Sequence, residues 1–175
     1  GYHLAKKCLL KKWNVVSFSK NPPKKKRFLK KVKYLIGDIS NKKNFKLIDR
    51  KFNYVVNLGG YVDHTNKTKT YNSHFKGCKI LSNFFLKKKI ESFIQMGSSG
   101  EYGIAKSPQQ ENFTCRPVSI YAKSKFLATK YLISLHKKKK FPVTILRLYQ
   151  AYGPKQDINR FIPIVIDACL KKISF

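Results

Sequence analysis

The strongest indication of a fold comes from three consecutive segments: IESFIQM at residues 90–96, GSSGEYG at residues 97–103 and IYAKSKFLATKYLISLH at residues 120–136. The first is a short apolar run that predicts a buried strand. The second is rich in glycine and serine and predicts a loop. The third predicts a long helix from the spacing of its apolar residues. A strand therefore ends in a loop of small residues, and a helix follows that loop.

The same alternation of strands and helices extends along the whole chain. Strands are expected at residues 14–19, 32–36, 54–58, 90–96 and 143–148, and helices at residues 2–12, 43–51, 71–88, 120–136 and 160–172. Several of the strands are almost continuously apolar, as they are in a parallel sheet that is covered on both faces. The pattern predicts an α/β fold built on a doubly wound parallel sheet.

The composition is typical of one globular domain over residues 1–175. Apolar residues make up 42% of the chain, which is too many for a disordered polycation. No apolar run approaches the ~18 residues that favour a membrane-spanning helix. The cysteines are scattered without the spacing of a zinc site, and they resemble the buried thiols of a reducing compartment. We therefore expect no metal, no membrane and a cytoplasmic location.

The net charge of +30 has two explanations. A strongly basic surface is typical of nucleic-acid binding, because it releases counterions from phosphates. However, only five of the 38 basic residues are arginines, and Asn, Ile, Phe and Tyr are plentiful, which is the bias of an AT-rich genome. We favour genomic bias over a nucleic-acid partner. Either way, the charge attracts anions such as nucleotides.

Tyr121 and Lys125 stand four residues apart, which places them on one face of the predicted helix. A free phenol has a pKa near ~10, and a nearby ammonium stabilises the phenolate form. Ser98, at the end of the preceding strand, could hydrogen-bond the substrate oxygen whose proton moves. These three groups are suited to oxidising an alcohol or reducing a ketone beside a hydride carrier.

The order of short motifs resembles that of the extended short-chain dehydrogenase/reductase family, the NAD-dependent epimerases and dehydratases that act on nucleotide sugars. The similar segments are Gly1-Tyr2-His3-Leu4, Gly37-Asp38-Ile39, Asn57-Leu58-Gly59-Gly60, Ser98 to Gly103, Tyr121 with Lys125, Leu146 to Pro154, and Arg160-Phe161-Ile162-Pro163. Each motif alone is weak, but their shared order along the whole chain is specific. The resemblance implies a Rossmann-like domain that binds NAD or NADP.

The resemblance also implies a role for individual residues. Tyr121 would be the general acid or base, Lys125 would bind the nicotinamide ribose, and Ser98 would hydrogen-bond the reacting oxygen. The implied cofactor contacts are Gly1, Ser19, Lys20, Asp38, Ile39, Leu58, Gly59, Gly60, His74, Tyr121, Lys125 and Tyr149, and the implied substrate contacts are Ser98, Ser99, Gln150 and Arg160. Simpler explanations remain for some of them, because Tyr149 could be a core residue and Arg160 could cap its helix.

Two positions depart from the family pattern. The family usually has an acidic residue at the end of the second strand, where it binds the ribose hydroxyls of NAD. This chain has Ser19 followed by Lys20 there, which makes NADP an option because Lys20 could attract a 2′-phosphate. His74 stands where the family commonly has Asn, and it could donate a hydrogen bond to the backbone or the cofactor or be a core or surface histidine.

The loop sequence also bears on the type of reaction. Dehydratases of the family carry acidic residues directly after the catalytic hydroxyl, whereas this chain has Ser99 and Gly100 there, and Glu101 is expected to point elsewhere. We therefore expect hydride transfer at the sugar C4, either as a nucleotide-sugar epimerase or as a 4-keto-6-deoxy-sugar reductase of the GDP-mannose-derived type. A non-catalytic, basic RNA-binding relative is the alternative outside this class.

The resemblance further implies a larger protein. The chain begins at what resembles the last glycine of the nucleotide-binding turn, so the first strand of the sheet and the C-terminal substrate-binding part are expected to be missing. We expect the 175 residues alone to be inactive. For the intact protein we expect a nucleotide-sugar substrate and a homodimer.

Overall fold

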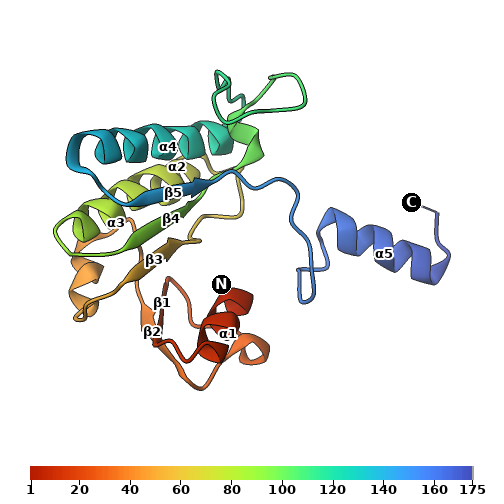
Figure 1. The fold of residues 1–175 in the computed structure, drawn as a ribbon. Coiled ribbons are helices and arrows are strands. Elements are labelled where there is room, and N and C mark those ends of the chain that lie inside the picture. The colour runs from red at the N-terminus through yellow and green to blue at the C-terminus, as the bar shows by residue number, and fades with distance from the viewer. Residues whose placement is uncertain (175) are drawn as a thin grey trace.

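The computed structural model describes residues 1–174, in which helices and strands alternate (Figure 1). The helices are α1 (Tyr2–Leu10), α2 (Lys67–Tyr71), α3 (Gly77–Leu86), α4 (Ile120–Lys139) and α5 (Phe161–Lys171), and the strands are β1 (Val15–Ser19), β2 (Val32–Ile36), β3 (Tyr54–Asn57), β4 (Ser92–Met96) and β5 (Val143–Leu146). Every predicted strand is present. The helix expected at 43–51 is a 3₁₀ helix over Lys42–Leu47.

All strand pairs are parallel, but they form two sheets and not one. β1 pairs with β2, while β3, β4 and β5 form a three-stranded sheet in that order. Among residues 1–174 no hydrogen-bonded ladder joins β1 to β3, so each of these strands has an open edge.

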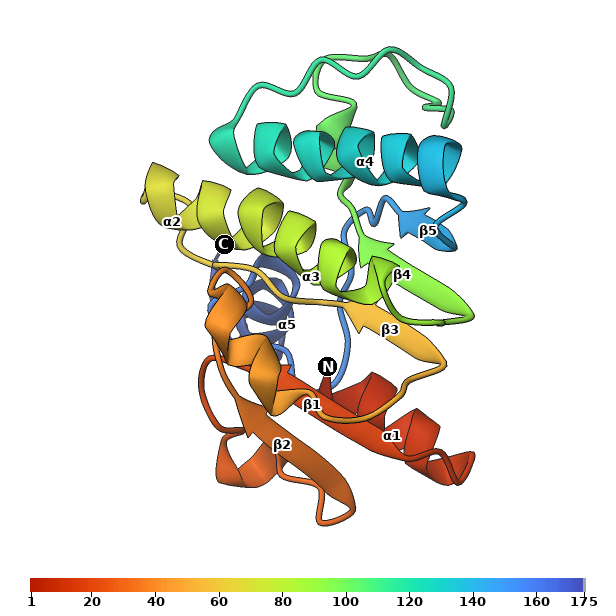
Figure 2. The same cartoon turned by 90° about the vertical axis from the view of Figure 1, so that its left-hand side faces the viewer.

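The main core lies between the three-stranded sheet and the layer formed by α3 and α4 (Figure 2). Phe93 of β4 and Leu132 of α4 are fully buried, and burial of such side chains contributes about 1.5–3 kcal/mol each. The buried residues of this core are Phe45, Ile48, Cys78, Leu81, Phe85, Phe93, Ala128, Leu132, Leu135 and Phe141. α1 contacts β1, and α5 has no buried residue and projects away from the other layers (Figure 1).

Both ends of α4 follow from local sequence. The side chain of Ser119 accepts a hydrogen bond from Ala122 N at 3.1 Å and so caps the first turn. The helix ends where Lys140 takes a left-handed conformation, and the basic residues of its last turn suit the negative end of the helix dipole. The helix therefore starts directly before Tyr121 and carries Lys125 one turn further on.

The helix expected at 71–88 is longer and is not regular. It begins at Lys67, because the Asn66 side chain accepts a hydrogen bond from Lys69 N at 2.9 Å. A π-helical segment, Asn72–Lys76, then separates α2 from α3. Such segments are often found at functional sites, and this one holds His74.

The cysteines do not form disulfides, but they are not all buried as expected: Cys78 is buried, whereas Cys169 is exposed on α5. Burial raises the pKa of the Cys78 thiol to about 12, which makes it unreactive. No helix within residues 1–174 is both long enough and apolar enough to cross a membrane.

Candidate active site

Most of the predicted site residues follow the carboxyl ends of the parallel strands. Ser19 ends β1, Asp38 follows β2, Gly59 follows β3, and Ser98 follows β4. Because the strands within each sheet are parallel, these ends share an edge in each sheet, and Ile39 after β2 packs close to Gly59 after β3. In open α/β sheets, ligands bind at this edge.

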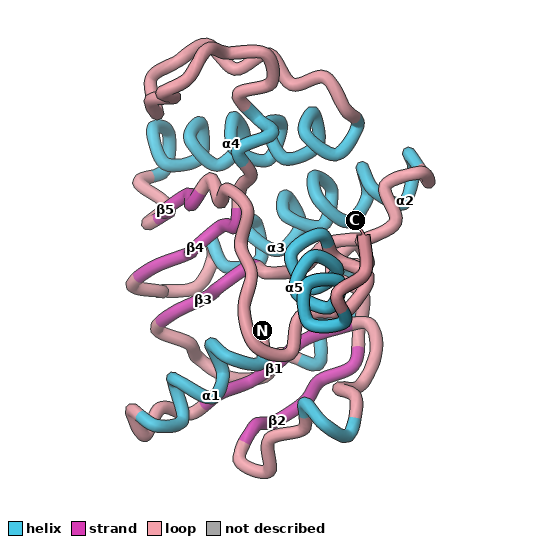
Figure 3. The backbone as a smooth tube through the Cα atoms, turned by 90° about the vertical axis from the view of Figure 1, so that its right-hand side faces the viewer, coloured by secondary structure: helices cyan, strands magenta, loops and turns pink. Residues whose placement is uncertain are grey.

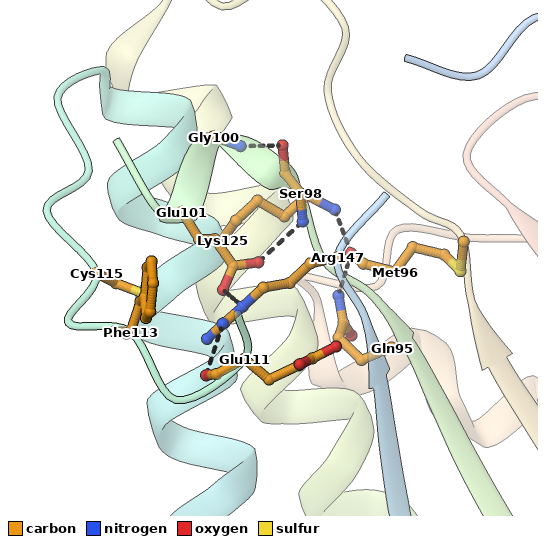
Figure 4. Close-up of polar contacts among 10 residues, drawn as sticks. All are labelled: Gln95, Met96, Ser98, Gly100, Glu101, Glu111, Phe113, Cys115, Lys125 and Arg147. Atoms are coloured by element: carbon orange, nitrogen blue, oxygen red, sulfur yellow. Dashed lines mark hydrogen bonds and ion pairs between the residues drawn. The ribbon is translucent and has the colours of Figure 1, made fainter. Parts of the chain in front are cut away.

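Ser98 begins the short 3₁₀ helix Ser99–Glu101, and two hydrogen bonds fix its position (Figure 4). Its Oγ accepts a hydrogen bond from Gly100 N at 3.2 Å, and its backbone N–H donates to Glu101 Oε1 at 2.9 Å. The next residue, Ser99, donates its N–H to Leu148 O at 2.8 Å, which ties the loop to the segment after β5. The loop is therefore held on both sides.

Lys125 connects α4 to this loop. It is only 5% exposed, and its Nζ donates a hydrogen bond to Met96 O, at the end of β4, at 2.6 Å. The same Nζ lies 5.8 Å from the centre of the Tyr121 ring. Burial lowers the pKa of Lys125, and the nearby carboxylate of Glu101 partly opposes this effect. Tyr121, Lys125 and the Ser98 loop thus occupy the same end of β4.

Two histidines flank the Tyr121 ring. His64, from the loop after β3, stacks on it with ring centres 4.2 Å apart, and His74 meets it edge-on at 5.0 Å. The Nε2 atom of His74 lies 3.1 Å from the carbonyl oxygen of Tyr61. A carbonyl can only accept, so Nε2 carries the hydrogen, and the buried Nδ1 is an acceptor without a partner among residues 1–174.

Burial of His74 makes the stability of the fold sensitive to acid. Burial, with the charge of Lys125, lowers the pKa of His74 from 6.5 to about 4. Protonation therefore favours the unfolded chain, so stability is full above pH 6.5 and falls as the pH drops toward about 4. We expect His74→Asn to remove up to about 3 kcal/mol of this acid dependence. Urea unfolding at several pH values measures it, and equal pH dependence in both proteins would contradict the expectation.

Asp38 and Lys20 contact each other at the other end of the edge. Lys20 Nζ lies 3.3 Å from Asp38 Oδ2, and Ser40 donates two hydrogen bonds to Asp38 Oδ1. Burial raises the pKa of Asp38, but these hydrogen bonds and the Lys20 charge outweigh it and hold the pKa below its usual value. The Ser19 hydroxyl donates to Asn21 O at 2.8 Å. Asp38 is thus both a turn residue and a charged acceptor.

The glycines after β3 leave room for close packing. A Cβ on Gly60 would stand 2.1 Å from Cε1 of His74, and a Cβ on Gly59 would stand 3.2 Å from Cδ1 of Ile39. Leu58, which precedes them, is 41% exposed. No side chain fits at Gly60 without displacing His74, so the glycine lets the His74 ring pack directly against the backbone.

The remaining predicted residues are less closely grouped. Tyr149 is 60% exposed and is not a core residue, and its hydroxyl donates to Gln109 Oε1 at 2.6 Å. Gln150 is also exposed. The chain then runs past α1, where His3 contacts Pro154 O at 2.8 Å, before α5 begins (Figure 3). Gly1 is exposed at the start of α1, and Arg160 is exposed at the start of α5, apart from Tyr121.

Sequence reasoning expected Glu101 to point away from the position of a dehydratase acid or base, and gave it no other role. The structure buries it completely, and its side chain contacts Ser98 N and Arg147 (Figure 4). The spacing of Ser98 and Glu101 is that of a capping box, in which the third residue of a helix bonds back to the residue that caps it. That motif was visible in the sequence.

The comparisons with known proteins identify the family and the fold. The model of the NAD dependent epimerase/dehydratase family matches residues 1–174. No curated protein matches the sequence. The fold is similar to UDP-glucose 4-epimerase from Thermotoga maritima with UDP-glucose, with a TM-score of 0.85 and 18% identity over 99% of this chain and 60% of that one.

Two further solved structures are similar to the same extent. One is dTDP-glucose 4,6-dehydratase from Bacillus anthracis in complex with NAD (TM-score 0.84, 19% identity, 98% of this chain and 58% of that one). The other is UDP-glucose 4-epimerase from Thermus thermophilus with NAD (TM-score 0.84, 20% identity, 100% of this chain and 60% of that one). The chain thus spans about 60% of the length of these relatives. With its Rossmann-like α/β fold and its match over residues 1–174, the chain belongs to the NAD-dependent epimerase/dehydratase family.

Proposed function

We propose that the intact protein transfers a hydride between C4 of a nucleotide sugar and NAD or NADP. The observation that carries this proposal is the hydrogen bond from Lys125 Nζ to Met96 O, because it holds the Tyr121 helix against the end of β4, two residues before Ser98. A phenol, an ammonium and a hydroxyl at the carboxyl edge of a parallel sheet suit this chemistry. NAD, when bound, accepts the hydride.

Three residues of the chain have separate proposed roles in the reaction. Tyr121 takes the proton from the sugar hydroxyl during oxidation and returns it during reduction. Ser98 donates a hydrogen bond to the same oxygen. Lys125 has one hydrogen bond within residues 1–174, which leaves two of its N–H donors for the hydroxyls of a ribose. The residues therefore fit a nicotinamide ribose beside α4.

The adenosine end of the cofactor has two candidate partners. Asp38 is held by Ser40 and Lys20, and its Oδ2 is free to accept a hydrogen bond from the adenine amino group in addition to the Lys20 charge. Lys20 is 76% exposed and directly follows Ser19, which stands where the family usually has an acidic residue. This exchange favours tolerance of a 2′-phosphate, so NADP is proposed beside NAD.

The type of reaction follows from the loop after β4. Ser99 and Gly100 offer no acid or base for elimination of water, and Glu101 is buried against Arg147. An epimerase, which returns the hydride to the opposite face, or a 4-keto sugar reductase is therefore proposed and not a dehydratase. The similar solved structures include 4-epimerases and a 4,6-dehydratase, so this choice rests on the loop sequence.

The experiment is a substrate panel on the intact protein. UDP-glucose, dTDP-glucose and GDP-mannose are each mixed with enzyme and NAD or NADP, and a GDP-linked 4-keto-6-deoxy sugar is mixed with enzyme and NADH or NADPH. Nicotinamide absorbance and the sugar products are followed in every case. We expect a transient reduced nicotinamide and a C4 epimer with one sugar. Oxidation of NADPH only with a 4-keto-6-deoxy sugar would favour the reductase. Salt-dependent RNA binding without affinity for either cofactor would overturn the proposal in favour of the RNA-binding alternative.

Residues 1–175 are proposed to form a single cofactor-binding domain within this enzyme, and the intact protein is proposed to be a cytoplasmic homodimer. We also propose that four residues contact the sugar nucleotide: Ser98, Ser99, Gln150 and Arg160. Arg160 directly precedes α5, which has no buried residue within the described chain, so the contact of Arg160 with substrate depends on where α5 packs in the intact protein.

A further inference from the structure

Glu101 is the one fully buried carboxylate within residues 1–174. Removal of an ionised carboxylate from water costs several kcal/mol unless it is paired and hydrogen-bonded. An apolar side chain would pack at this position without that cost. The partners of Glu101 therefore indicate why a carboxylate stands there.

The two oxygens of Glu101 have separate partners (Figure 4). Oε1 accepts a hydrogen bond from the backbone N–H of Ser98 at 2.9 Å, and Oε2 accepts one from Nε of Arg147 at 3.3 Å. Arg147 is itself held, because its Nη1 donates to Glu111 O at 3.2 Å and its Cζ lies 4.7 Å from the Tyr102 ring centre. The carboxylate thus links the start of the Ser98 loop to the residue that follows β5.

The loop is shaped around this carboxylate. A Cβ on Gly97 would stand 2.6 Å from Glu101 Oε1 and 3.3 Å from Arg147 Cγ. Any side chain at Gly97 would displace the oxygen that receives the Ser98 N–H. A glycine directly before Ser98 therefore leaves the space that the Glu101 side chain occupies.

These contacts determine how Ser98 can present its hydroxyl. Its N–H is held by Glu101, and its Oγ accepts from Gly100 N at 3.2 Å. Because Oγ already accepts one hydrogen bond, its hydrogen is free to donate to another oxygen. A Ser98 backbone that lost the Glu101 contact could rotate, and the hydroxyl would no longer hold one direction.

We propose that Glu101 is a positioning residue: its carboxylate, anchored by Arg147, holds the Ser98 N–H so that the Ser98 hydroxyl points at the reacting sugar oxygen. This inference rests on the proposed function. The competing explanation is that Glu101 only stabilises the fold.

A double-mutant cycle in the intact enzyme separates the two explanations. The rate of nicotinamide reduction with UDP-glucose as the probe is compared in wild type, Glu101→Ala, Ser98→Ala and the double variant. We expect Glu101→Ala to lower the rate about 10- to 100-fold when Ser98 is present, as for loss of a hydrogen bond to a charged group. With Ser98→Ala in place, we expect less than about a twofold further loss. Equal losses in both backgrounds would overturn the proposal.

Two further variants serve as controls, one for loss of folding and one for removal of a carboxylate away from the site. Glu101→Gln keeps an acceptor for Ser98 N and is expected to retain activity within about tenfold of wild type, with the same dependence on Ser98. If Glu101→Ala does not fold, the double-mutant cycle of Glu101→Gln with Ser98→Ala distinguishes the positioning role from the purely structural one. Glu91→Ala removes an exposed carboxylate at the opposite end of β4, where it accepts from the Tyr54 hydroxyl, and is expected to leave the rate unchanged.

A second readout does not depend on turnover. Amide hydrogen exchange at Ser98 is expected to be slow in wild type and to rise at least about tenfold in Glu101→Ala, with exchange in β4 unchanged. Unchanged exchange at Ser98 would overturn the proposal. A wild-type enzyme without turnover, or a Ser98→Ala variant with full activity, would instead overturn the proposed function of the site, so the two failures are distinguishable.

Discussion

Tyr121→Phe is expected to lower the rate of hydride transfer in the intact enzyme by about 10³-fold, within the range that general acid–base catalysis supplies. The ring contacts with His64 and His74 involve the faces and edges of the aromatic ring, which phenylalanine keeps. The proposed contacts of Lys125 with the cofactor are untouched. NAD affinity is therefore expected to change by less than about threefold, and the thermal midpoint by little.

The chain offers a matched control on the same helix. Tyr131 also lies on α4, and its hydroxyl donates to Asn83 Oδ1 at 2.7 Å, far from the Ser98 loop. Tyr131→Phe removes the same atom and is expected to leave the rate of hydride transfer unchanged. Turnover by Tyr121→Phe at more than about a tenth of the wild-type rate would contradict an acid–base role for this phenol. Cofactor titration by fluorescence and rapid-mixing absorbance provide the measurements.

The sequence was informative wherever a property depends on local pattern. The strands follow from short apolar runs between glycine- and proline-rich loops, and β2 has the predicted bounds of Val32–Ile36. The start of α4 follows from its helical spacing, and the proximity of Tyr121 and Lys125 follows from one turn of that helix. These properties need no knowledge of distant contacts.

Properties that depend on the tertiary structure could not be predicted. The separation of β1 from β3 depends on which strands become neighbours, and the predicted doubly wound sheet does not reveal it. The packing of His64 on Tyr121 joins residues from different loops, and no pattern along the chain encodes it. The π-helical segment around His74 likewise replaces a helix that the apolar spacing predicts as regular.

Glu101 lies between these two cases. Its hydrogen bond to Ser98 is local and follows from the capping-box spacing. Its ion pair with Arg147 is not local, because it joins the loop after β4 to the residue after β5. A carboxylate was therefore recognisable as a cap in the sequence, but its complete burial was not.

Lys125→Met is expected to damage both cofactor binding and catalysis, in contrast to Tyr121→Phe. The Lys125 ammonium is buried, and it is the group proposed to bind the ribose and to stabilise the phenolate of the tyrosine base. We expect NAD affinity to fall about 10-fold or more, because a charged donor is worth about 1.5–3 kcal/mol. Since phenolate stabilisation is lost as well, the rate should fall about a further 10²-fold.

The fold is expected to tolerate this change. Burial lowers the pKa of Lys125, which shows that the charged form is held at some cost in free energy. Methionine is similar in length and pays no such desolvation cost, although it leaves Met96 O without its donor. The two effects oppose each other, so we expect the free energy of unfolding to change by less than about 2 kcal/mol.

Lys123→Met on the same helix is the control, because it makes the same substitution at an exposed position two residues away. It also removes one positive charge from a chain of net charge +30, so a nonspecific loss of attraction for anionic nucleotides affects both variants equally. If NAD affinity falls to the same extent in both, the basic surface and not the Lys125 site accounts for binding. If it falls only in Lys125→Met, the cofactor lies against α4, where Lys125 joins the phenol of Tyr121 to the end of β4.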